Sequence, residues 1–254
     1  LRQNVNFHNG DVMDADDVVA SLNRWVENYS AVKDLIGESR FEKVDDSTVK
    51  ITLDGPCATL PYMLAAGSQR AVITTAEACE NEGEDGYMSE VIGTGPYMLT
   101  ETVTDQYTML ERFDDYSPYG DPDEPSDGWA GYKHAYTPKI CAWVVSEEAT
   151  RVAGLQTEQY DSANVSDAML ATLENNEDIT LEYEEEGGQV AIVFNKQSGL
   201  CSDVNMRKAI NSIVNPEELL MVSYGSSYTL NASYMESTQP LWFSDAGSEY
   251  YGTM

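Results

Sequence analysis

The amino-acid sequence predicts a mixed α/β protein with at least two lobes. A helix and a β-hairpin come first, and strands then alternate with helices over most of the remaining chain. The composition also shifts near residue 90, where we expect a domain boundary. With 254 residues, 42% of them hydrophobic, the chain is long enough to bury a sizeable core.

The first 90 residues are predicted to hold a helix, a hairpin and a second, brief helix. Asp14 is expected to cap a helix over residues 15–26, where apolar side chains recur at helical spacing. Residues 41–53 alternate between apolar and polar around a turn at 45–47, as in a hairpin with one buried face. The apolar run 62–66 ends at Gly67, which favours a short helix there.

Two paired strands are expected near residues 97–99 and 107–110. A long ordered loop over residues 114–137 should follow, held in place by its aromatic side chains, which are Tyr116, Tyr119, Trp129, Tyr132 and Tyr136. Residues 138–145 then resemble a strand, and Ser146 is a suitable cap for a helix that ends near Gln156.

The last third alternates between helix and strand signals. A helix is predicted over residues 166–173 and a strand over 179–183. The unbroken apolar run 190–194 is typical of a strand buried on both faces. Asp203 should cap the next helix, and Asn215, followed by a proline, should cap the one after it.

The charge balance excludes whole classes of partner. The chain has 14 Lys and Arg against 44 Asp and Glu, which gives a formal net charge of −30. Phosphate backbones and anionic membrane surfaces should be repelled, so we expect no nucleic-acid binding. The acidic residues are spread along the chain among 16 Tyr and 4 Trp, which favours a solvated surface over a disordered acidic tail.

The four cysteines, Cys57, Cys79, Cys141 and Cys201, form no C-x-x-C pair, so neither a sulfur-bound metal nor any cofactor is expected. Their spacing suits one or two disulfides and suits buried free thiols equally well. No apolar run is long enough for a transmembrane segment. The sequence opens at Leu1 in a strand-like phrase, so any export signal should lie upstream or be absent.

Five phrases, in order, resemble the extracellular solute-binding proteins of family 5, which serve oligopeptide, dipeptide and nickel ABC importers. They are residues 1–10 (LRQNVNFHNG) with 14–19, the GTGPY of residues 93–97, residues 111–116, the segment 153–161, and Phe194-Asn195 with 203–210. In the fourth phrase, similar to the family's ALxxGExD, the usual Gly-Glu is replaced by Glu158-Gln159.

The resemblance implies a periplasmic-binding-protein-like fold of type II, peptide-binding class, incomplete at both ends. It places a small α+β accessory domain at residues 1–90, the central part of a mixed-sheet first lobe at 91–195, and the hinge-side start of a second lobe at 196–254. It also implies an extracellular protein, lipid-anchored or periplasmic, that binds peptides or a related small solute and delivers them to an ABC permease without catalysis.

Candidate ligand-binding residues come from the resemblance and from the local sequence. Arg70 is the first ligand-binding candidate, because in nickel-type relatives an arginine in the comparable segment faces the cleft; a structural ion pair is the alternative role for it. Ser68, Gln69 and Asn195 are further candidates, as polar groups beside apolar runs.

A second group of residues is expected to shape the backbone. Gly93, Thr94, Gly95, Pro96 and Tyr97 should form a crossover between lobes, with glycines at positive φ. Phe194-Asn195 is a second hinge-side crossover. His8 is interpreted as a hydrogen-bonded structural residue, Asp203 as a helix cap, and Arg207 as the partner of a carboxylate.

Two other functions compete with the binding protein. Asp121-Pro122-Asp123-Glu124 through Asp127-Gly128 offers oxygen ligands for a calcium-binding surface module, although the proline disrupts EF-hand spacing. A hydrolase is the other alternative, but neither a G-x-S-x-G nor an H-E-x-x-H motif is present.

Overall fold

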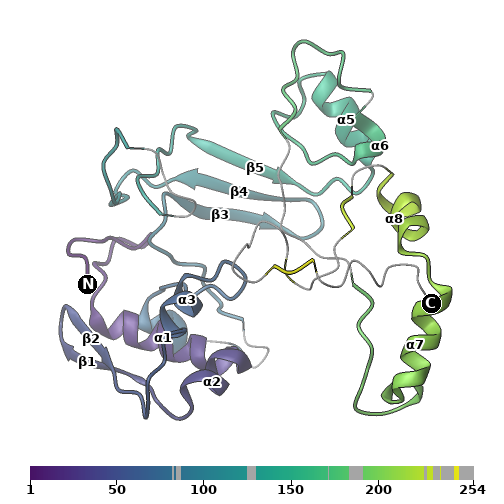
Figure 1. Cartoon of the computed structure of the whole chain (residues 1–254). Helices are drawn as coiled ribbons and strands as arrows, with labels where there is room; N and C mark the ends of the chain where they lie inside the picture. The colour runs from purple at the N-terminus through teal and green to yellow at the C-terminus, as the bar shows by residue number, and fades with distance from the viewer. Residues whose placement is uncertain are drawn as a thin grey trace. The chain divides into compact units, whose positions relative to one another are not determined.

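The structure, a computed structural model, describes residues 1–81, 83, 87–124, 130–170, 172–182, 191–225, 228–230, 235 and 243–245. Internal contacts divide the chain into two compact units, Leu1–Val144 and Val145–Met254 (Figure 1). The predicted accessory domain and the start of the predicted first lobe both fall inside the first unit. The domain boundaries at residues 90 and 195 stay predictions.

The first unit is organised around helix α1 (Ala15–Asn28). The Asp14 carboxylate accepts hydrogen bonds from the backbone N–H of Asp16 at 2.8 Å and of Asp17 at 3.3 Å. The Asp17 carboxylate accepts one in return from the Asp14 N–H at 3.1 Å, which completes a capping box. The predicted cap is confirmed, and the apolar stripe of the helix, including Trp25 and Val26, is buried.

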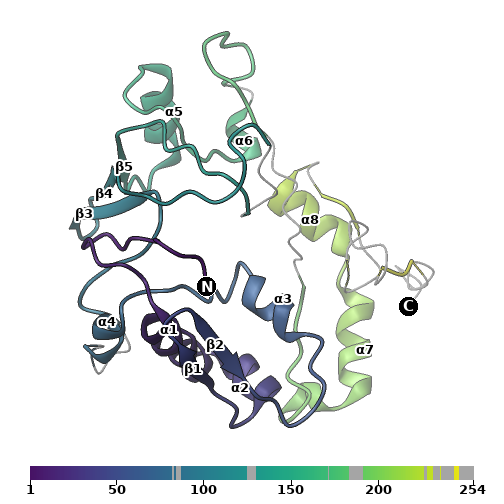
Figure 2. The same ribbon diagram turned by 90° about the vertical axis from the view of Figure 1, so that its left-hand side faces the viewer.

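Helix α2 (Ser30–Ile36) and the hairpin β1 (Phe41–Asp45) and β2 (Thr48–Ile51) pack against α1 (Figure 2). The strands are antiparallel, which confirms the predicted hairpin, and Phe41 stands opposite Ile51. Their buried side chains form one hydrophobic core with the apolar stripe of α1. The members of this core are Val18, Leu22, Trp25, Val26, Val32, Ile36, Phe41 and Leu60.

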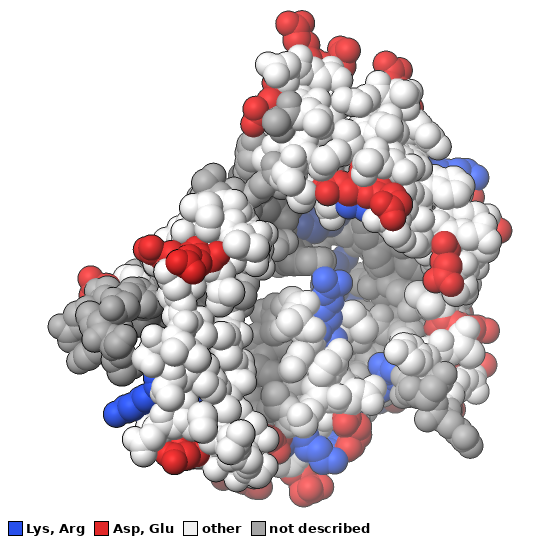
Figure 3. All heavy atoms as spheres, turned by 90° about the vertical axis from the view of Figure 1, so that its right-hand side faces the viewer, with Lys and Arg blue, Asp and Glu red and all other residues white. Residues whose placement is uncertain are grey.

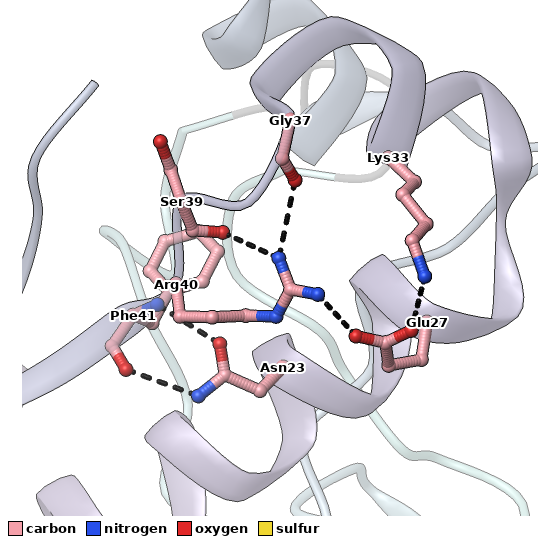
Figure 4. A network of polar contacts seen from close by, with 7 residues as sticks. All are labelled: Asn23, Glu27, Lys33, Gly37, Ser39, Arg40 and Phe41. Atoms are coloured by element: carbon pink, nitrogen blue, oxygen red, sulfur yellow. Dashed lines mark hydrogen bonds and ion pairs between the residues drawn. The ribbon is translucent and has the colours of Figure 1, made fainter. Parts of the chain in front are cut away.

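A polar network joins α1, α2 and the start of β1 (Figure 4). The Asn23 amide pairs with both backbone groups of Phe41, at 3.0 and 2.9 Å. Glu27 accepts hydrogen bonds from Lys33, at 2.8 Å, and from Arg40. These two hydrogen bonds hold the pKa of the Glu27 carboxyl below its ordinary value. The network therefore links the end of α1 to α2 and to the first strand.

The rest of the first unit contains two short helices and a second sheet. The helices are α3 (Leu60–Ala65) and α4 (Ala76–Glu80), and the Thr75 hydroxyl caps the second. The strands β3 (Tyr97–Val103), β4 (Tyr107–Arg112) and β5 (Lys139–Trp143) form one antiparallel sheet in the order β3-β4-β5. This confirms the predicted strand pair and the predicted strand after the long loop.

The long loop has no regular element in its described parts, residues 114–124 and 130–137, as expected. Tyr116 and Tyr132 are half-buried, whereas Tyr119 and Tyr136 are exposed, and the anchoring role of these rings stays a prediction. Trp129 lies outside the described residues.

The second unit contains the helices α5 (Glu148–Gln156), α6 (Asp167–Leu170), α7 (Val204–Ile213) and α8 (Pro216–Tyr224), with a 3-10 turn η1 (Leu200–Ser202) before α7. The Asn215 side chain caps α8 as predicted, at 3.1 Å from the Glu217 N–H. The expected cap at Ser146 is wrong, because Glu147 occupies that position and its side chain makes no capping hydrogen bond.

The two strands predicted in this unit are not formed within the described residues 179–182 and 191–194. Ile192 and Val193 are 58% and 89% exposed, so the apolar run is not buried on both faces here. A strand requires a neighbour to pair with, and an apolar run alone does not supply one. Neither segment pairs with another strand in the part of the chain that the structure describes.

The surface matches the charge prediction, because acidic side chains outnumber basic ones on the face drawn in Figure 3. All four cysteines are free thiols. Among the described residues, no helix combines the length and apolar character needed to cross a membrane.

Candidate ligand-binding and crossover segments

The predicted ligand-binding residues Ser68, Gln69 and Arg70 form one loop that directly follows α3. The indole Nε1 of Trp25, in the buried stripe of α1, donates a hydrogen bond to the Gln69 carbonyl oxygen at 2.8 Å. Arg70 Nε donates to the Gly67 carbonyl oxygen at 2.8 Å and so closes the turn. The core of the first unit therefore fixes the backbone of this loop.

The side chains of the loop offer an acceptor and a cation. Ser68 and Arg70 are exposed, and Gln69 is half-buried. The Gln69 Oε1 atom is itself buried and accepts no hydrogen bond within the described chain. Leaving a buried acceptor unpaired costs about 1–3 kcal/mol, so a donor that reached this atom would be stabilised there. The guanidinium group of Arg70, the next residue, suits a carboxylate, because it can bind one with two parallel hydrogen bonds.

The predicted crossover at residues 93–97 is tied to the N-terminal segment by His8. The backbone N–H of His8 donates to the Gly93 carbonyl oxygen at 3.0 Å, and the Gly93 N–H donates to His8 Nδ1 at 3.3 Å. Because Nδ1 accepts, the ring proton lies on Nε2, which donates to the Gly95 carbonyl oxygen at 3.0 Å. The ring also stands edge-on to Phe113, with centroids 5.2 Å apart. The structural role predicted for His8 is confirmed.

The conformation predicted for the crossover glycines is wrong. Neither Gly93 nor Gly95 has a positive φ. A Cβ added at Gly93 would lie 3.6 Å from His8 Cε1, which is an ordinary van der Waals contact. The hydrogen bonds to His8 instead hold this backbone in a conformation that other residues can also adopt.

The C-terminal end of the crossover is anchored to the three-stranded sheet and to the loop that follows β4. The Pro96 carbonyl oxygen accepts from the Phe113 N–H at 2.9 Å. Tyr97 begins β3, and its hydroxyl donates to the Thr137 carbonyl oxygen at 2.9 Å. The segment therefore passes from the helix-and-hairpin core to the sheet under hydrogen-bond restraint.

The N-terminal segment also contacts the loop that follows β4. Arg2 donates to the Ser117 carbonyl oxygen at 2.6 Å, and the Ser117 hydroxyl donates to the Asn4 carbonyl oxygen at 2.7 Å. Asn6 donates to the Asp115 carbonyl oxygen at 3.2 Å. Residues 2–8 thus connect the crossover and the loop. No pattern in the sequence predicts these partners, because they lie far apart along the chain.

In the second unit, Asn195 forms a local turn in which its Oδ1 accepts from the Gln197 N–H at 3.0 Å. Its side chain is exposed, and its role in ligand binding stays a prediction. Asp203 caps α7 as expected, at 2.8 Å from the Asn205 N–H.

The carboxylate partner predicted for Arg207 is wrong. Arg207 Nη1 donates to the carbonyl oxygens of Cys201 and Ser202, at 2.8 and 3.0 Å. Among the described residues it forms no ion pair. The carbonyl groups of the η1 turn lie within reach of the guanidinium, so backbone oxygens satisfy it in place of a carboxylate.

The calcium alternative is only partly covered by the described residues. No group of three or more His, Cys, Asp or Glu side chains within them is arranged to hold a metal ion. Asp121 Oδ1 accepts from the Asp123 N–H at 2.9 Å, as in an ordinary turn. Asp127 and Gly128 lie outside the described residues.

Comparison with solved structures defines the class of protein. The chain resembles the periplasmic binding protein DppA from Helicobacter pylori in complex with the peptide STSA, with a TM-score of 0.72, 20% identity, and coverage of 94% of this chain and 48% of that one. It also resembles NikZ from Campylobacter jejuni in complex with Ni(L-His), with a TM-score of 0.70, 21% identity, and coverage of 91% and 44%. The fold is therefore that of the type II periplasmic binding proteins, as predicted.

The sequence comparison defines the family. Residues 1–253 match the family described as "Bacterial extracellular solute-binding proteins, family 5 Middle", and the chain belongs to this family. It is 28% identical to the probable peptide ABC transporter periplasmic-binding protein y4tO of Sinorhizobium fredii, over 89% of this chain and 43% of that protein. The chain thus spans less than half the length of this curated relative.

Proposed function

We propose that the full-length protein is the substrate-binding component of an ABC importer, which captures peptides outside the membrane and hands them to the permease. The family match over residues 1–253 is the observation that carries this proposal. The family is described as one of extracellular solute-binding proteins, and we propose that this member makes and breaks no bond. Its location would be extracellular, either lipid-anchored or periplasmic.

The loop after α3 is the proposed ligand contact in the first unit. Arg70 would bind a carboxylate of the peptide. The half-buried Gln69 side chain, whose Oε1 has no hydrogen-bond partner within the described chain, would turn outward to accept from a peptide N–H. Ser68 adds an exposed hydroxyl. The Trp25 hydrogen bond to this loop would reduce the entropy lost on binding, because the backbone is already held in place.

Binding would be coupled to lobe closure in the full-length protein. We propose that the crossovers at residues 93–97 and 194–195 lie on the hinge side, where small backbone rotations move one lobe against the other. A ligand favours the closed form only by binding it more tightly than the open form. The permease would then distinguish loaded from empty protein by this difference in conformation.

The test is to express the full-length protein and identify co-purifying ligands by native mass spectrometry. Peptides would support the proposal. A different small molecule would refute the peptide assignment and leave the importer assignment standing. Turnover of the bound peptide would contradict the view that the protein is not an enzyme.

Variants separate ligand contact from structural support. Arg70→Ala should weaken peptide binding about tenfold or more, since a charged hydrogen bond is worth about 1.5–3 kcal/mol. Lys50→Ala is the matched control, because Lys50 is an exposed cation that pairs with Glu42 on the hairpin. Gln69→Leu should also weaken binding. If it instead raised stability and left the affinity unchanged, Gln69 would be a strained structural residue and not a ligand contact.

A further inference from the structure

Three segments of the chain have the N-x-S pattern that accepts N-linked glycans. They are Asn28-Tyr29-Ser30, Asn164-Val165-Ser166 and Asn231-Ala232-Ser233, and the middle residue is not proline in any of them. The third segment lies outside the described residues. The first two can be compared for exposure, backbone conformation and competing hydrogen bonds.

The first segment lies at the break between α1 and α2. Asn28 is the last residue of α1 and Ser30 the first of α2, and both are exposed. Tyr29 between them has an extended backbone, with φ −120° and ψ 104°. It is half-buried, and its N–H donates to the Trp25 carbonyl oxygen at 3.2 Å. The segment is therefore anchored through its middle residue, while the residues on either side face solvent.

The side chains of this first segment are available to an enzyme. Within the described chain, neither the Asn28 amide nor the Ser30 hydroxyl makes a hydrogen bond. An oligosaccharyltransferase needs both groups, because the amide is the acceptor and the hydroxyl two residues later is the recognition element. No side-chain hydrogen bond of Asn28 or Ser30 within the described protein has to be broken to present these two groups.

The second segment differs at the hydroxyl. Asn164 is exposed in an irregular stretch, and its carbonyl oxygen accepts from Arg151 Nε at 3.1 Å. The Ser166 hydroxyl, however, donates to Glu148 Oε2 at 3.0 Å, and the Ser166 N–H donates to the other oxygen of the same carboxylate. These hydrogen bonds also lower the pKa of the Glu148 carboxyl, which stays ionised at neutral pH. The recognition hydroxyl is thus already occupied in the folded chain.

We propose that Asn28 and Asn164 are N-glycosylation sites, and that Asn28 is modified more completely than Asn164. The donor would be a lipid-linked oligosaccharide phosphate or pyrophosphate. A bond forms between Asn Nδ2 and C1 of the first sugar, the bond from C1 to the phosphate oxygen breaks, and Nδ2 loses one proton as the lipid phosphate leaves. The inference rests on the proposed location outside the membrane, where such transfer takes place.

Glycans at these positions suit the rest of the molecule. Both asparagines are exposed, so a bulky hydrophilic group would displace no core side chain. Neither lies within the loop 67–70 or the crossover 93–97, the segments proposed for ligand binding and hinge motion. Modification should therefore change solubility and protease resistance and leave peptide affinity unchanged.

The experiment uses the full-length protein isolated from the organism that produces it, with cell fractionation and glycopeptide mass spectrometry on the same sample. We expect a glycan on the peptide containing Asn28 and a smaller glycosylated fraction at Asn164. Ser30→Ala should abolish modification of Asn28, whereas Ser30→Thr, which keeps the hydroxyl, should retain it. Glu148→Ala should raise the glycosylated fraction at Asn164 by freeing the Ser166 hydroxyl.

The outcomes separate this inference from the proposed function. Exported protein with an unmodified Asn28 would overturn the glycosylation proposal and leave the importer assignment intact. Protein found only inside the cell would overturn the proposed location, and the glycosylation proposal with it. Equal occupancy at the two sites, or an Asn164 fraction that Glu148→Ala does not raise, would overturn the predicted ranking.

Discussion

Replacing His8 with alanine should loosen the crossover between the helix-and-hairpin core and the three-stranded sheet. The substitution removes the Nδ1 acceptor of the Gly93 N–H and the Nε2 donor to the Gly95 carbonyl oxygen. It also removes the edge-on ring contact with Phe113. The backbone hydrogen bond from His8 to Gly93 remains, so the segment should be weakened and not released.

The two side-chain hydrogen bonds and the ring contact of His8 set the expected magnitude. Each hydrogen bond contributes about 0.5–1.5 kcal/mol, and an aromatic edge contact about 0.5–1.5 kcal/mol beyond the area it buries. His8 is half-buried, so water partly replaces these interactions in the variant. We therefore expect His8→Ala to lower the free energy of unfolding of the first unit by about 2–3 kcal/mol. For a chain of this size that corresponds to a fall in Tm of roughly 4–12 °C.

Urea unfolding followed by tryptophan fluorescence measures this change, because Trp25 lies in the core of the first unit. Hydrogen exchange should become faster at Gly93 in particular. His134→Ala is the matched control: the chain has two histidines, and His134 is exposed, stacked on the exposed ring of Tyr136. A decrease below about 0.5 kcal/mol for His8→Ala, or a decrease equal to that of His134→Ala, would refute the reasoning.

Three further predictions concern the second unit and the net charge. Glu158 follows α5 with a φ of 58°, at a position where the similar family phrase has glycine. Glu158→Gly should therefore raise the free energy of unfolding by about 0.5–1 kcal/mol. Glu158→Ala, which removes the same charge but keeps a Cβ, should not raise it. A Cβ at Gly154 would lie 2.2 Å from the Tyr160 ring, so Gly154→Ala should lower the free energy of unfolding, measured in urea, by about 1–3 kcal/mol. Adding Tyr160→Ala to the Gly154→Ala chain should restore most of this lost stability. Raising KCl from about 0.01 to 1 M shortens the Debye length from about 30 to 3 Å, and so weakens repulsion within a chain of net charge −30. The Tm measured by circular dichroism should rise with salt, and a fall would show that screened ion pairs matter more than repulsion.

The helix end at Glu158 shows what a motif can and cannot reveal. The Gln159 N–H donates to the Gly154 carbonyl oxygen at 2.8 Å and the Glu158 N–H to the Leu155 carbonyl oxygen at 3.2 Å, the pattern of a Schellman motif. The altered family phrase already marked this position as unusual. Only the backbone angle shows why glycine suits it.

Local signals in the sequence determined a large part of the fold. The caps at Asp14, Asp203 and Asn215 and the hairpin at residues 41–51 are where the pattern predicts them. Each depends on groups only a few residues apart, so a short stretch of sequence contains the whole interaction. The family phrases, which also occupy short stretches, likewise led to the correct family.

Tertiary structure decided the contacts that cross long distances along the chain. His8 bonds to Gly93, 85 residues away, and Trp25 to Gln69, 44 residues away. Arg207 uses backbone oxygens in place of a carboxylate, and the apolar run at 191–194 forms no strand in the described chain. Which donor meets which acceptor depends on how distant segments pack. Composition and charge could be known from residue types alone, whereas the partners of His8 and Gln69 could be known only once the chain had folded.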